Sequence, residues 1–355
     1  MGALGRRERL TLALALGVSV AGVALSQAGA DAVLVFAVSG LALALLASLV
    51  GQATEQLGER LGPGATGVLQ SALGNLPELF FGIFALRLGK VAVVQATIVG
   101  SILGNSLLVL GLAFLVGGLR HGTQRFDSQT PRMIATLTAL AVAALAVPTL
   151  ARGLHTAAGD HTEALSIACA IVLLIVFVAS IPFSLSGGTG GVPAPEQETE
   201  TAHWPLALAA GILLASGVGA AVVSDVFVNA LTPATKALHI SEVFTGLVIV
   251  AIAGNAVENV VGIQLAARNK PDYAISVILN SSLQVALGLT PILVLASFVV
   301  GSTHLTLALP GLLVGALGLT AALGALIVYD GESTWLEGVA LIGLYCIIAA
   351  SFWWG

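Results

Sequence analysis

A carboxylate recurs in one local sequence pattern, inside two long apolar runs that lie about half the chain apart. Segments 74–78 (GNLPE) and 254–258 (GNAVE) each place a glutamate four residues after a glycine. An ionisable side chain inside such a run is expensive to bury in lipid, roughly 2.5–3.5 kcal/mol on insertion scales. A chain that carries this cost twice in the same local sequence is expected to use both glutamates, Glu78 and Glu258.

Composition places the chain among polytopic membrane proteins. Of its 355 residues, 57% are hydrophobic and only 9% are charged, which no soluble domain of this size matches. A transmembrane barrel would need short segments of alternating polarity, whereas the runs here are long and uniformly apolar. The fold class expected is therefore all-α. The net charge of −5 is scattered and indicates no nucleic-acid partner.

The apolar runs predict about eleven transmembrane helices. They lie at 10–28, 31–51, 65–87, 90–117, 132–151, 163–185, 205–229, 242–267, 271–300, 304–328 and 335–353. The first run also resembles a signal peptide, because basic residues precede it and small residues follow it. Its length, and the many spans after it, favour a retained helix.

The similarity between the two halves extends beyond the glutamates. Four further pairs match at an offset of 180 or 170 residues: Lys90 with Lys270, Ser101 with Ser281, Glu55 with Asp225, and Pro63 with Pro233. The second copy is ten residues longer between Pro233 and Gly254. We expect a peripheral helix at 1–30, then two inverted five-helix repeats at 31–185 and 205–355, joined by an acidic cytoplasmic linker at 186–204.

Basic residues in the short loops predict the orientation. With the N-terminus in the cytoplasm, nine lysines and arginines lie in inside loops and four in outside loops. Eleven spans then place the C-terminus outside. The first motif span runs outward and the second runs inward, as an inverted repeat requires.

The two motifs have the chemistry of a site for a hard cation. Ca²⁺ takes about 6–8 oxygen ligands from carboxylates, amides, carbonyls and water. Glu78 and Glu258 supply two charges, and Asn75 and Asn255 supply amide oxygens or hold the glutamates in place. Breaks at the two glycines, Gly74 and Gly254, would free backbone carbonyls, which is tolerated only where they line a cavity or contact protein.

A second polar set follows each motif. Ser101 and Asn105 share a helix face, and Ser281 and Gln284 lie in the matching span, with Gln95 near the first pair. These residues are candidates for cation or proton binding. For the serines and Gln95, a hydrogen bond between neighbouring helices is an equal alternative. Glu55 and Asp225 are candidates for proton acceptors or gates, against the alternative of carboxylates at helix ends.

Paired carboxylates also predict competition between a divalent cation and protons. Burial and mutual repulsion favour neutralisation of the pair, by one Ca²⁺ or by two protons. An empty, doubly charged site would be costly to carry across the membrane. Coupled exchange follows if the protein changes orientation only when the pair is neutral.

These residues make the sequence resemble the calcium/cation antiporter superfamily, and within it the cation/proton exchanger family of Ca²⁺/H⁺ antiporters. That family carries Gly-Asn-Ala-Pro-Glu and Gly-Asn-Ala-Ala-Glu where this chain has 74–78 and 254–258. The resemblance implies eleven helices, with one peripheral helix and two inverted repeats. It also implies proton coupling, because sodium-coupled relatives usually have Gly-Thr or Gly-Ser in place of Gly-Asn. Departures at Asp225 and Asn280 leave the cation preference open.

The expected function is secondary active export of Ca²⁺ from the cytoplasm in exchange for H⁺, by alternating access at the paired glutamates. The same fold moving Na⁺, K⁺ or Mn²⁺ is one alternative, and a passive cation channel is another. An enzyme is not expected, because no nucleophile or metal-binding histidine set accompanies the glutamates. We expect no cofactor besides the transported ions, and a location in the plasma membrane of a bacterium. A homo-oligomer and a vacuolar membrane stay open.

Overall fold

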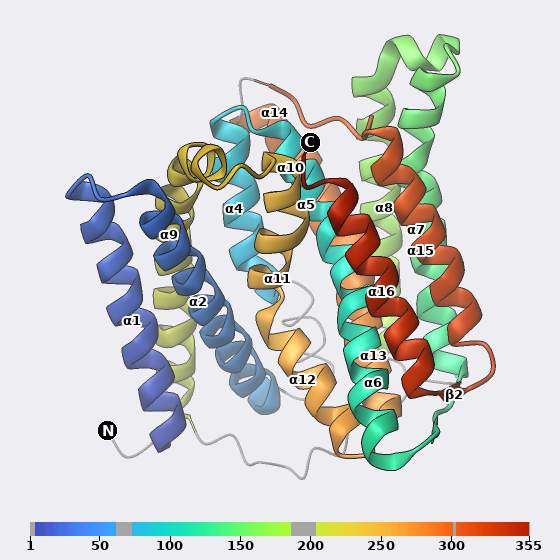
Figure 1. The fold of residues 1–355 in the computed structure, drawn as a ribbon, viewed down its shortest axis with the longest axis horizontal. Helices are drawn as coiled ribbons and strands as arrows, with labels where there is room; N and C mark the ends of the chain where they lie inside the picture. Colours follow the sequence, from blue (N-terminus) through green and yellow to red (C-terminus); the bar gives the residue numbers. More distant parts are fainter. Residues whose placement is uncertain (1–3, 62–72, 186–203, 301–302, 355) are drawn as a thin grey trace.

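The computed structural model describes residues 4–61, 73–185, 204–300 and 303–354. The described part is almost entirely helical (Figure 1). Its helices are α1 (Arg6–Gln27), α2 (Ala32–Leu61), α4 (Leu76–Arg87), α5 (Val91–Leu103), α6 (Leu110–His121), α7 (Gln129–Gly153), α8 (Thr162–Leu185), α9 (Leu206–Leu238), α10 (Glu242–Phe244), α11 (Ala251–Gly254), α12 (Ala256–Ala267), α13 (Pro271–Gln284), α14 (Thr290–Val300), α15 (Gly311–Ile327) and α16 (Trp335–Ser351).

Four short helical segments and two short strands complete the described elements. The strands β1 (Gln124–Arg125) and β2 (Glu332–Ser333) pair antiparallel at one end of the bundle. The helical segments are the 3₁₀ turn η2 (Ala157–His161) and the π-helical turns η1 (Gly104–Val109), η3 (Thr245–Val250) and η4 (Val285–Leu289). π-Turns are rare and occur frequently at functional sites.

The predicted all-α membrane architecture is confirmed in its coarse form. Within the described residues, seven helices are long and apolar enough to cross a membrane, and a bent pair, Glu242–Gly254 with Glu258–Ala267, is an eighth candidate. α15 and α16 are shorter apolar helices. The predicted span at 65–87 falls partly outside the described residues, so the count of eleven stays a prediction.

Two helices extend well beyond the apolar runs that predicted them. α2 continues past the predicted end at 51, through Glu55, and α9 continues past 229 to Leu238 with Pro233 inside it. A hydropathy-based prediction ends a span at the first polar residues. A helix can continue past them, because backbone hydrogen bonds hold it together whatever the side chains. Glu55 and Asp225 therefore lie within helices, and both are exposed in the isolated chain.

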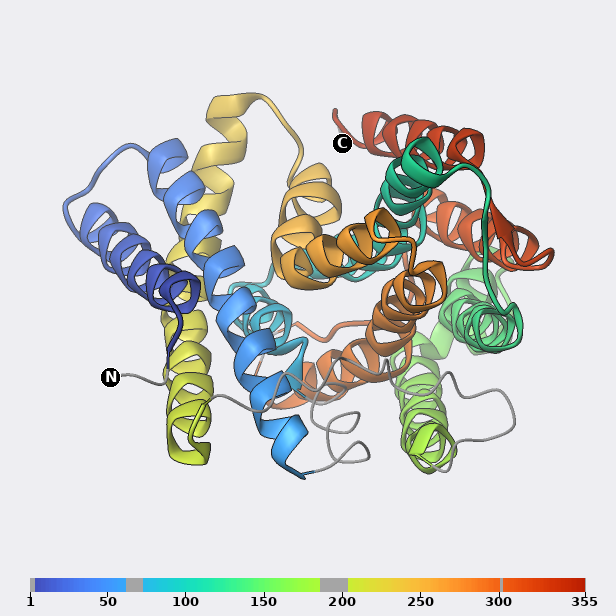
Figure 2. The ribbon, with the colours of Figure 1, turned by 90° about the horizontal axis from the view of Figure 1, so that it is seen from below.

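The helices form a side layer and a central bundle. α2 packs along α9, and α1 packs against α2, so these three lie together at one edge in both views (Figures 1 and 2). α7, α8, α15 and α16 lie at the opposite edge, and the central helices between the two edges include α4, α5, α11 and α12 (Figures 1 and 2). The side layer contacts the centre mainly where α9 meets α4 and where α2 meets α11 and α12.

Two glycines allow α5 and η3 to cross with their backbones in close approach. A Cβ atom on Gly100 would lie 2.1 Å from the Leu247 carbonyl oxygen, and one on Gly246 would lie 2.7 Å from that of Val93. Only glycine fits such a crossing, and small residues serve this purpose between membrane helices. The crossing brings the helix that follows the first motif against the helix that precedes the second.

An extended segment between α14 and α15 is held by buried hydroxyl groups. The backbone amides of Leu305, Leu307 and Leu309 donate to hydroxyl oxygens at 2.9, 2.9 and 2.8 Å. The acceptors come from three different helices: Ser297, Ser166 and Thr149, respectively. Gln95 adds a fourth contact, because its Nε2 atom donates to the Thr306 carbonyl at 2.8 Å. The segment thus satisfies its backbone without forming a strand.

Candidate cation-binding site

Both motifs begin a helix in the same way. Asn75 precedes α4 with φ −92° and ψ 17°, and Asn255 precedes α12 with φ −97° and ψ 22°. Each asparagine carbonyl accepts the first hydrogen bond of the new helix, from Leu79 and from Asn259. Because glutamate follows three residues after the asparagine in both motifs, Glu78 and Glu258 lie at equivalent places in the first turns of α4 and α12. The second break lies at the predicted step from glycine to asparagine, because α11 ends at Gly254 and α12 begins at Ala256, and Gly74 lies with Asn75 in the turn before α4.

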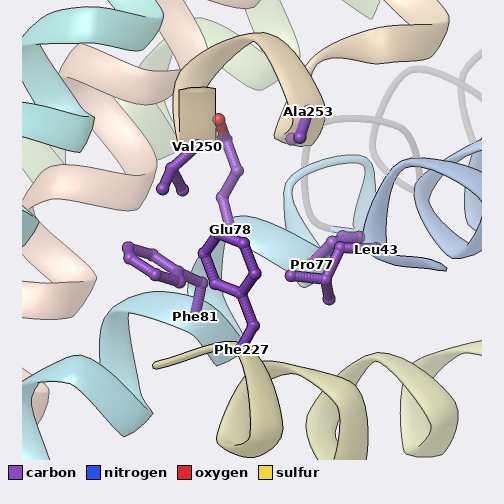
Figure 3. A pocket seen from close by; sticks show the side chains of 8 residues that line it. Leu43, Pro77, Glu78, Phe81, Phe227, Val250 and Ala253 are labelled. Carbon is purple, nitrogen blue, oxygen red and sulfur yellow. The ribbon is translucent and has the colours of Figure 1, made fainter. Parts of the chain in front are cut away.

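Glu78 is buried between the two halves of the chain. Its side chain is only 2% exposed, and it points from α4 toward η3 and α11 (Figure 3). Its Oε1 atom accepts hydrogen bonds from the Ser101 hydroxyl and from Asn255 Nδ2, both at 2.6 Å. Asn255 belongs to the second motif, so the two motifs are in direct contact through this pair.

Gly254 is required for this contact. A Cβ atom at position 254 would lie 2.5 Å from Glu78 Cγ and 2.7 Å from Oε1. These distances are too short for any side chain, and both atoms belong to the buried Glu78 side chain, which has little room to move. The glycine of the second motif therefore makes room for the carboxylate of the first.

The second carboxylate oxygen of Glu78 has no hydrogen-bond partner among the described residues, although it is buried. A small cavity of about 10 Å³ lies beside Glu78, roughly the room that one water molecule needs. Its lining is largely apolar (Figure 3): Leu43, Pro77, Glu78, Phe81, Phe227, Val250, Ala253 and Gly254. A buried oxygen without a partner, next to a cavity, is the arrangement expected of a cation or proton acceptor.

A polar network continues from Asn255 into the spans that follow the motifs. Asn105 Nδ2 donates to Asn255 Oδ1 at 3.3 Å and to the Ser281 hydroxyl at 2.9 Å. Ser281 donates to Asn255 Oδ1 at 3.2 Å. The network therefore joins α5, η1, α11, α12 and α13, and it contains predicted residues from both repeats.

Glu258 differs from Glu78 in its surroundings. It is half-buried, and the described residues provide no hydrogen bond from another side chain to its carboxylate. By the repeat symmetry its partners would be Asn75 and Ser281, but Ser281 is bonded to Asn105 and Asn255 instead. Asn75 is half-buried, and no hydrogen bond of its side chain is recorded within the described part of the chain.

The remaining predicted residues lie outside this network of contacts. Gln95 is directed to the backbone of the segment before α15, in line with the structural alternative considered for it. Gln284 is half-buried at the end of α13, and Gly74 is in the turn before α4. Glu55 and Asp225 are exposed on α2 and α9. The roles of these five residues in cation or proton binding stay predictions.

Two features of the site were missed by sequence reasoning. Ser106 pairs with Ser282 at 2.9 Å between the two halves, and its place beside Asn105 in an apolar run was the available signal. Leu43 and Phe227 line the cavity from the side layer. No local pattern marks these two, because they are ordinary apolar residues on long apolar helices.

The chemistry of the network suits a hard cation better than a soft one. No group of three His, Cys, Asp or Glu side chains that could hold a metal ion occurs among the described residues. The network provides one carboxylate, two asparagines and two serines, which are oxygen ligands of the kind that Ca²⁺ accepts, and Glu258 is the second carboxylate of the predicted pair. Ligands from water and from the carbonyls at the helix breaks would complete its coordination.

Comparison with known proteins supports the same assignment of the fold. Residues 31–186 and 208–354 match the sodium/calcium exchanger protein family. A Ca²⁺/H⁺ antiporter from Aphanothece halophytica is 36% identical over 340 residues, covering 91% of this chain and 90% of that protein. The Ca²⁺/H⁺ antiporter ChaA from Bacillus subtilis strain 168 is 35% identical over 343 residues, covering 94% and 96%.

Solved structures give the same picture at the level of the backbone. The structure of native YfkE superposes with a TM-score of 0.82 at 31% identity, covering 97% of this chain and 99% of that one. An H⁺/Ca²⁺ exchanger, CAX, superposes with a TM-score of 0.74 at 18% identity, which shows a shared fold. The arrangement of helices described above is therefore the arrangement of known exchangers.

Proposed function

Because this chain belongs to the sodium/calcium exchanger family, on its cation/proton exchanger branch, we propose that it exchanges Ca²⁺ for H⁺ across a membrane. It is a secondary transporter rather than an enzyme. The observation that carries the proposal is the contact between the two motifs, in which Asn255 of the second donates to Glu78 of the first at 2.6 Å. A cation bound there would contact both repeats at once.

Neutralisation of the glutamates provides the coupling. Ca²⁺ would bind to the carboxylates of Glu78 and Glu258, with oxygens of Asn75, Asn255, Ser101 and Ser281 nearby. Protons compete for the same carboxylate oxygens, so apparent Ca²⁺ affinity falls as the pH is lowered. An empty pair would leave two charges in an apolar surrounding, which opposes a change of orientation without cargo.

The side layer supplies alternating access. Leu43 of α2 and Phe227 of α9 line the cavity beside Glu78, so movement of these helices relative to the centre would open or close the site. Glu55 and Asp225 lie on the same two helices and would handle protons or gate the two entrances. The two inverted repeats, 31–185 and 205–355, would make the two entrances equivalent in outline.

The direction and location follow from the loop charges and the relatives. The N-terminus and the linker at 186–204 would lie in the cytoplasm, with the C-terminus outside. The bacterial Ca²⁺/H⁺ antiporters named above support an integral membrane protein, and we place it in the plasma membrane of a bacterium, where the exchange would export Ca²⁺. Exchange of Na⁺, K⁺ or Mn²⁺ by the same site is the second candidate, favoured by the departures at Asp225 and Asn280.

Proton movement in liposomes tests the proposal. Purified protein is reconstituted with a pH-sensitive dye, and Ca²⁺ is added to one side, with Glu78→Gln and Glu258→Gln tested alongside. We expect Ca²⁺-dependent proton release by the original protein and its loss in both variants, since each retains the shape of glutamate but not its charge.

Other outcomes are equally informative. Proton release triggered by Na⁺, K⁺ or Mn²⁺ instead would keep the mechanism and change the cargo. Ca²⁺ flux that does not depend on the proton gradient would support a passive channel. Undiminished exchange in both glutamine variants would refute the paired-glutamate site.

A further inference from the structure

Three polar side chains meet at the end of the bundle where α9 ends and α5 begins. Lys90 Nζ donates to the Thr232 hydroxyl at 2.5 Å and to Glu242 Oε1 and Oε2 at 2.9 and 3.3 Å. Thr232 also donates to Glu242 Oε1. The Lys90 and Glu242 side chains are 27% and 32% exposed, so water screens their attraction only in part. We call these three residues the latch triad.

The latch triad joins the side layer to the centre. Lys90 immediately precedes α5, whereas Thr232 lies in the last turns of α9 and Glu242 begins α10. The connection between α9 and α10 also contacts the end of the chain. The Ser241 hydroxyl donates a hydrogen bond to the Phe352 carbonyl oxygen at 2.5 Å, and the Ser241 backbone amide donates one to the Trp353 carbonyl oxygen at 3.0 Å. The end of α9 is thus fixed to two neighbours.

The latch triad is connected to the cation site along α9. Phe227 lies on α9 just over one turn before Thr232 and lines the cavity beside Glu78. If the site is to open toward the end of the bundle that holds Lys90, the last turns of α9 must separate from α5. Such a separation breaks the contacts of Thr232 with both Lys90 and Glu242.

Among the described residues, Lys270 forms no contact that matches the latch triad. Lys270 precedes α13 as Lys90 precedes α5, and the two lysines match at the repeat offset of 180. The repeat alignment places Gly62 opposite Thr232, at offset 170, whereas Glu242 lies between Pro233 and Gly254, in the stretch where the second repeat is ten residues longer. Glycine offers neither a hydroxyl nor a carboxylate. Lys270 is exposed, and no ion pair of it occurs among the described residues.

We propose that the latch triad is a one-sided positioning device, which holds the Lys90 end closed and must open whenever ions exchange at that end. This role presupposes the alternating access proposed above. Glu242 lies in the stretch where the second repeat is longer than the first. The two entrances therefore differ, because only the Lys90 end has this carboxylate. The resting protein then exposes its site mainly at the opposite end, which the loop charges assign to the cytoplasm.

Accessibility of a reporter cysteine tests the proposal. The full chain with Cys169→Ala and Cys346→Ala carries Ala253→Cys, a position that lines the cavity. Right-side-out and inside-out membrane vesicles are treated with a membrane-impermeant maleimide in the absence of Ca²⁺. The compared proteins are this parent, Lys90→Met, Glu242→Gln, the milder Thr232→Val, and the charge exchange Lys90→Glu with Glu242→Lys.

We expect labelling from the Lys90 end to become about fivefold faster in Lys90→Met and Glu242→Gln, the ratio that about 1 kcal/mol produces. Labelling from the opposite end should slow, and the charge exchange should return both rates toward the parent. Arg125→Gln is the matched control, because it breaks the ion pair of Arg125 with Glu332 at the other end of the bundle. That variant should label as the parent does.

The latch would be overturned if Lys90→Met, Glu242→Gln and Thr232→Val were all labelled from the Lys90 end at the parent rate. It would also be overturned if Arg125→Gln raised that labelling rate as much as Lys90→Met and Glu242→Gln do. The labelling rate is measured without Ca²⁺ and without a proton gradient, so it is independent of the exchange assay. Shifted labelling without exchange would refute the proposed function and keep the latch. Exchange with unchanged labelling rates would keep the proposed function and refute the latch.

Discussion

At the scale of single residues, the two motifs are alike in backbone and unlike in contacts. Asn75 and Asn255 break their helices with nearly the same dihedral angles. Glu78 nevertheless has two close donors, and Glu258 has none from the described side chains. Ser281, which by symmetry would contact Glu258, is hydrogen-bonded to Asn105 and Asn255 instead. Asn105 has no polar counterpart in the second repeat, because Val285 lies at offset 180. One residue without a symmetric partner therefore makes the two halves of the site unequal.

Ser101→Ala is expected to weaken Ca²⁺ binding. The change removes a hydroxyl that donates to Glu78 at 2.6 Å and accepts from Asn255 at 3.1 Å. A hydrogen bond to a charged group contributes roughly 1.5–3 kcal/mol, so the apparent dissociation constant should rise at least about tenfold. Titration of Ca²⁺-dependent proton release measures it.

Ser39→Ala provides the matched control for that change. Ser39 is also fully buried, but its hydroxyl donates only to carbonyls of its own helix, those of Val35 and Phe36. Its removal should leave Ca²⁺ affinity as in the parent. Equal effects from both serines would show that the loss reflects general packing rather than the site.

At the scale of helices, the crossing of α5 with η3 positions the site. Gly100 lies one residue before Ser101, and the crossing sets Ser101 within reach of Glu78 and Asn255. The π-turns η1 and η4 begin at matching places after the motifs, and η1 contains Asn105. Sequence periodicity predicted continuous helices here, because one extra residue in a turn leaves no trace in an apolar run.

Gly100→Ala is expected to disrupt this crossing. Its new methyl group would lie 2.1 Å from the Leu247 carbonyl oxygen, which belongs to backbone and cannot move aside freely. Overpacking of this kind usually costs about 1–3 kcal/mol. We expect a lower thermal unfolding temperature in detergent and a loss of exchange.

Gly104→Ala, four residues along the same face, tests whether the effect is specific. Apart from its own helix backbone and chain neighbours, no atom of the described residues lies within 4 Å of a Cβ built at that position, so the variant should unfold close to the parent temperature. If Gly100→Ala proved as stable and as active as Gly104→Ala, the close approach of α5 and η3 would be wrong.

At the scale of the whole molecule, the two ends of the chain lie at opposite ends of the bundle. α1 begins at the end that carries the β1–β2 pair, and α16 ends near α10 at the other (Figure 1). An odd number of membrane crossings has this consequence. The predicted topology, with the N-terminus in the cytoplasm and the C-terminus outside, is consistent with that geometry.

Epitope tags at the two ends test the topology. We expect antibody to reach a C-terminal tag on intact cells and an N-terminal tag only after permeabilisation, because basic loops are retained in the cytoplasm. A third tag within the linker at 186–204 should behave as the N-terminal tag does. Protection of the C-terminal tag in intact cells would contradict both the orientation and the outward position of the latch triad.

Sequence alone determined the class of this protein, because apolar run length, buried charge and internal repetition are properties of neighbouring residues along the chain. They predicted a helical membrane protein, its family, and the two glutamates. Tertiary structure decided which polar groups meet: Asn255 with Glu78, Gln95 with Thr306, and Lys90 with Glu242, each across more than 150 residues. Contacts at such separation depend on how helices cross and where glycines admit close approach, and no local pattern encodes that geometry.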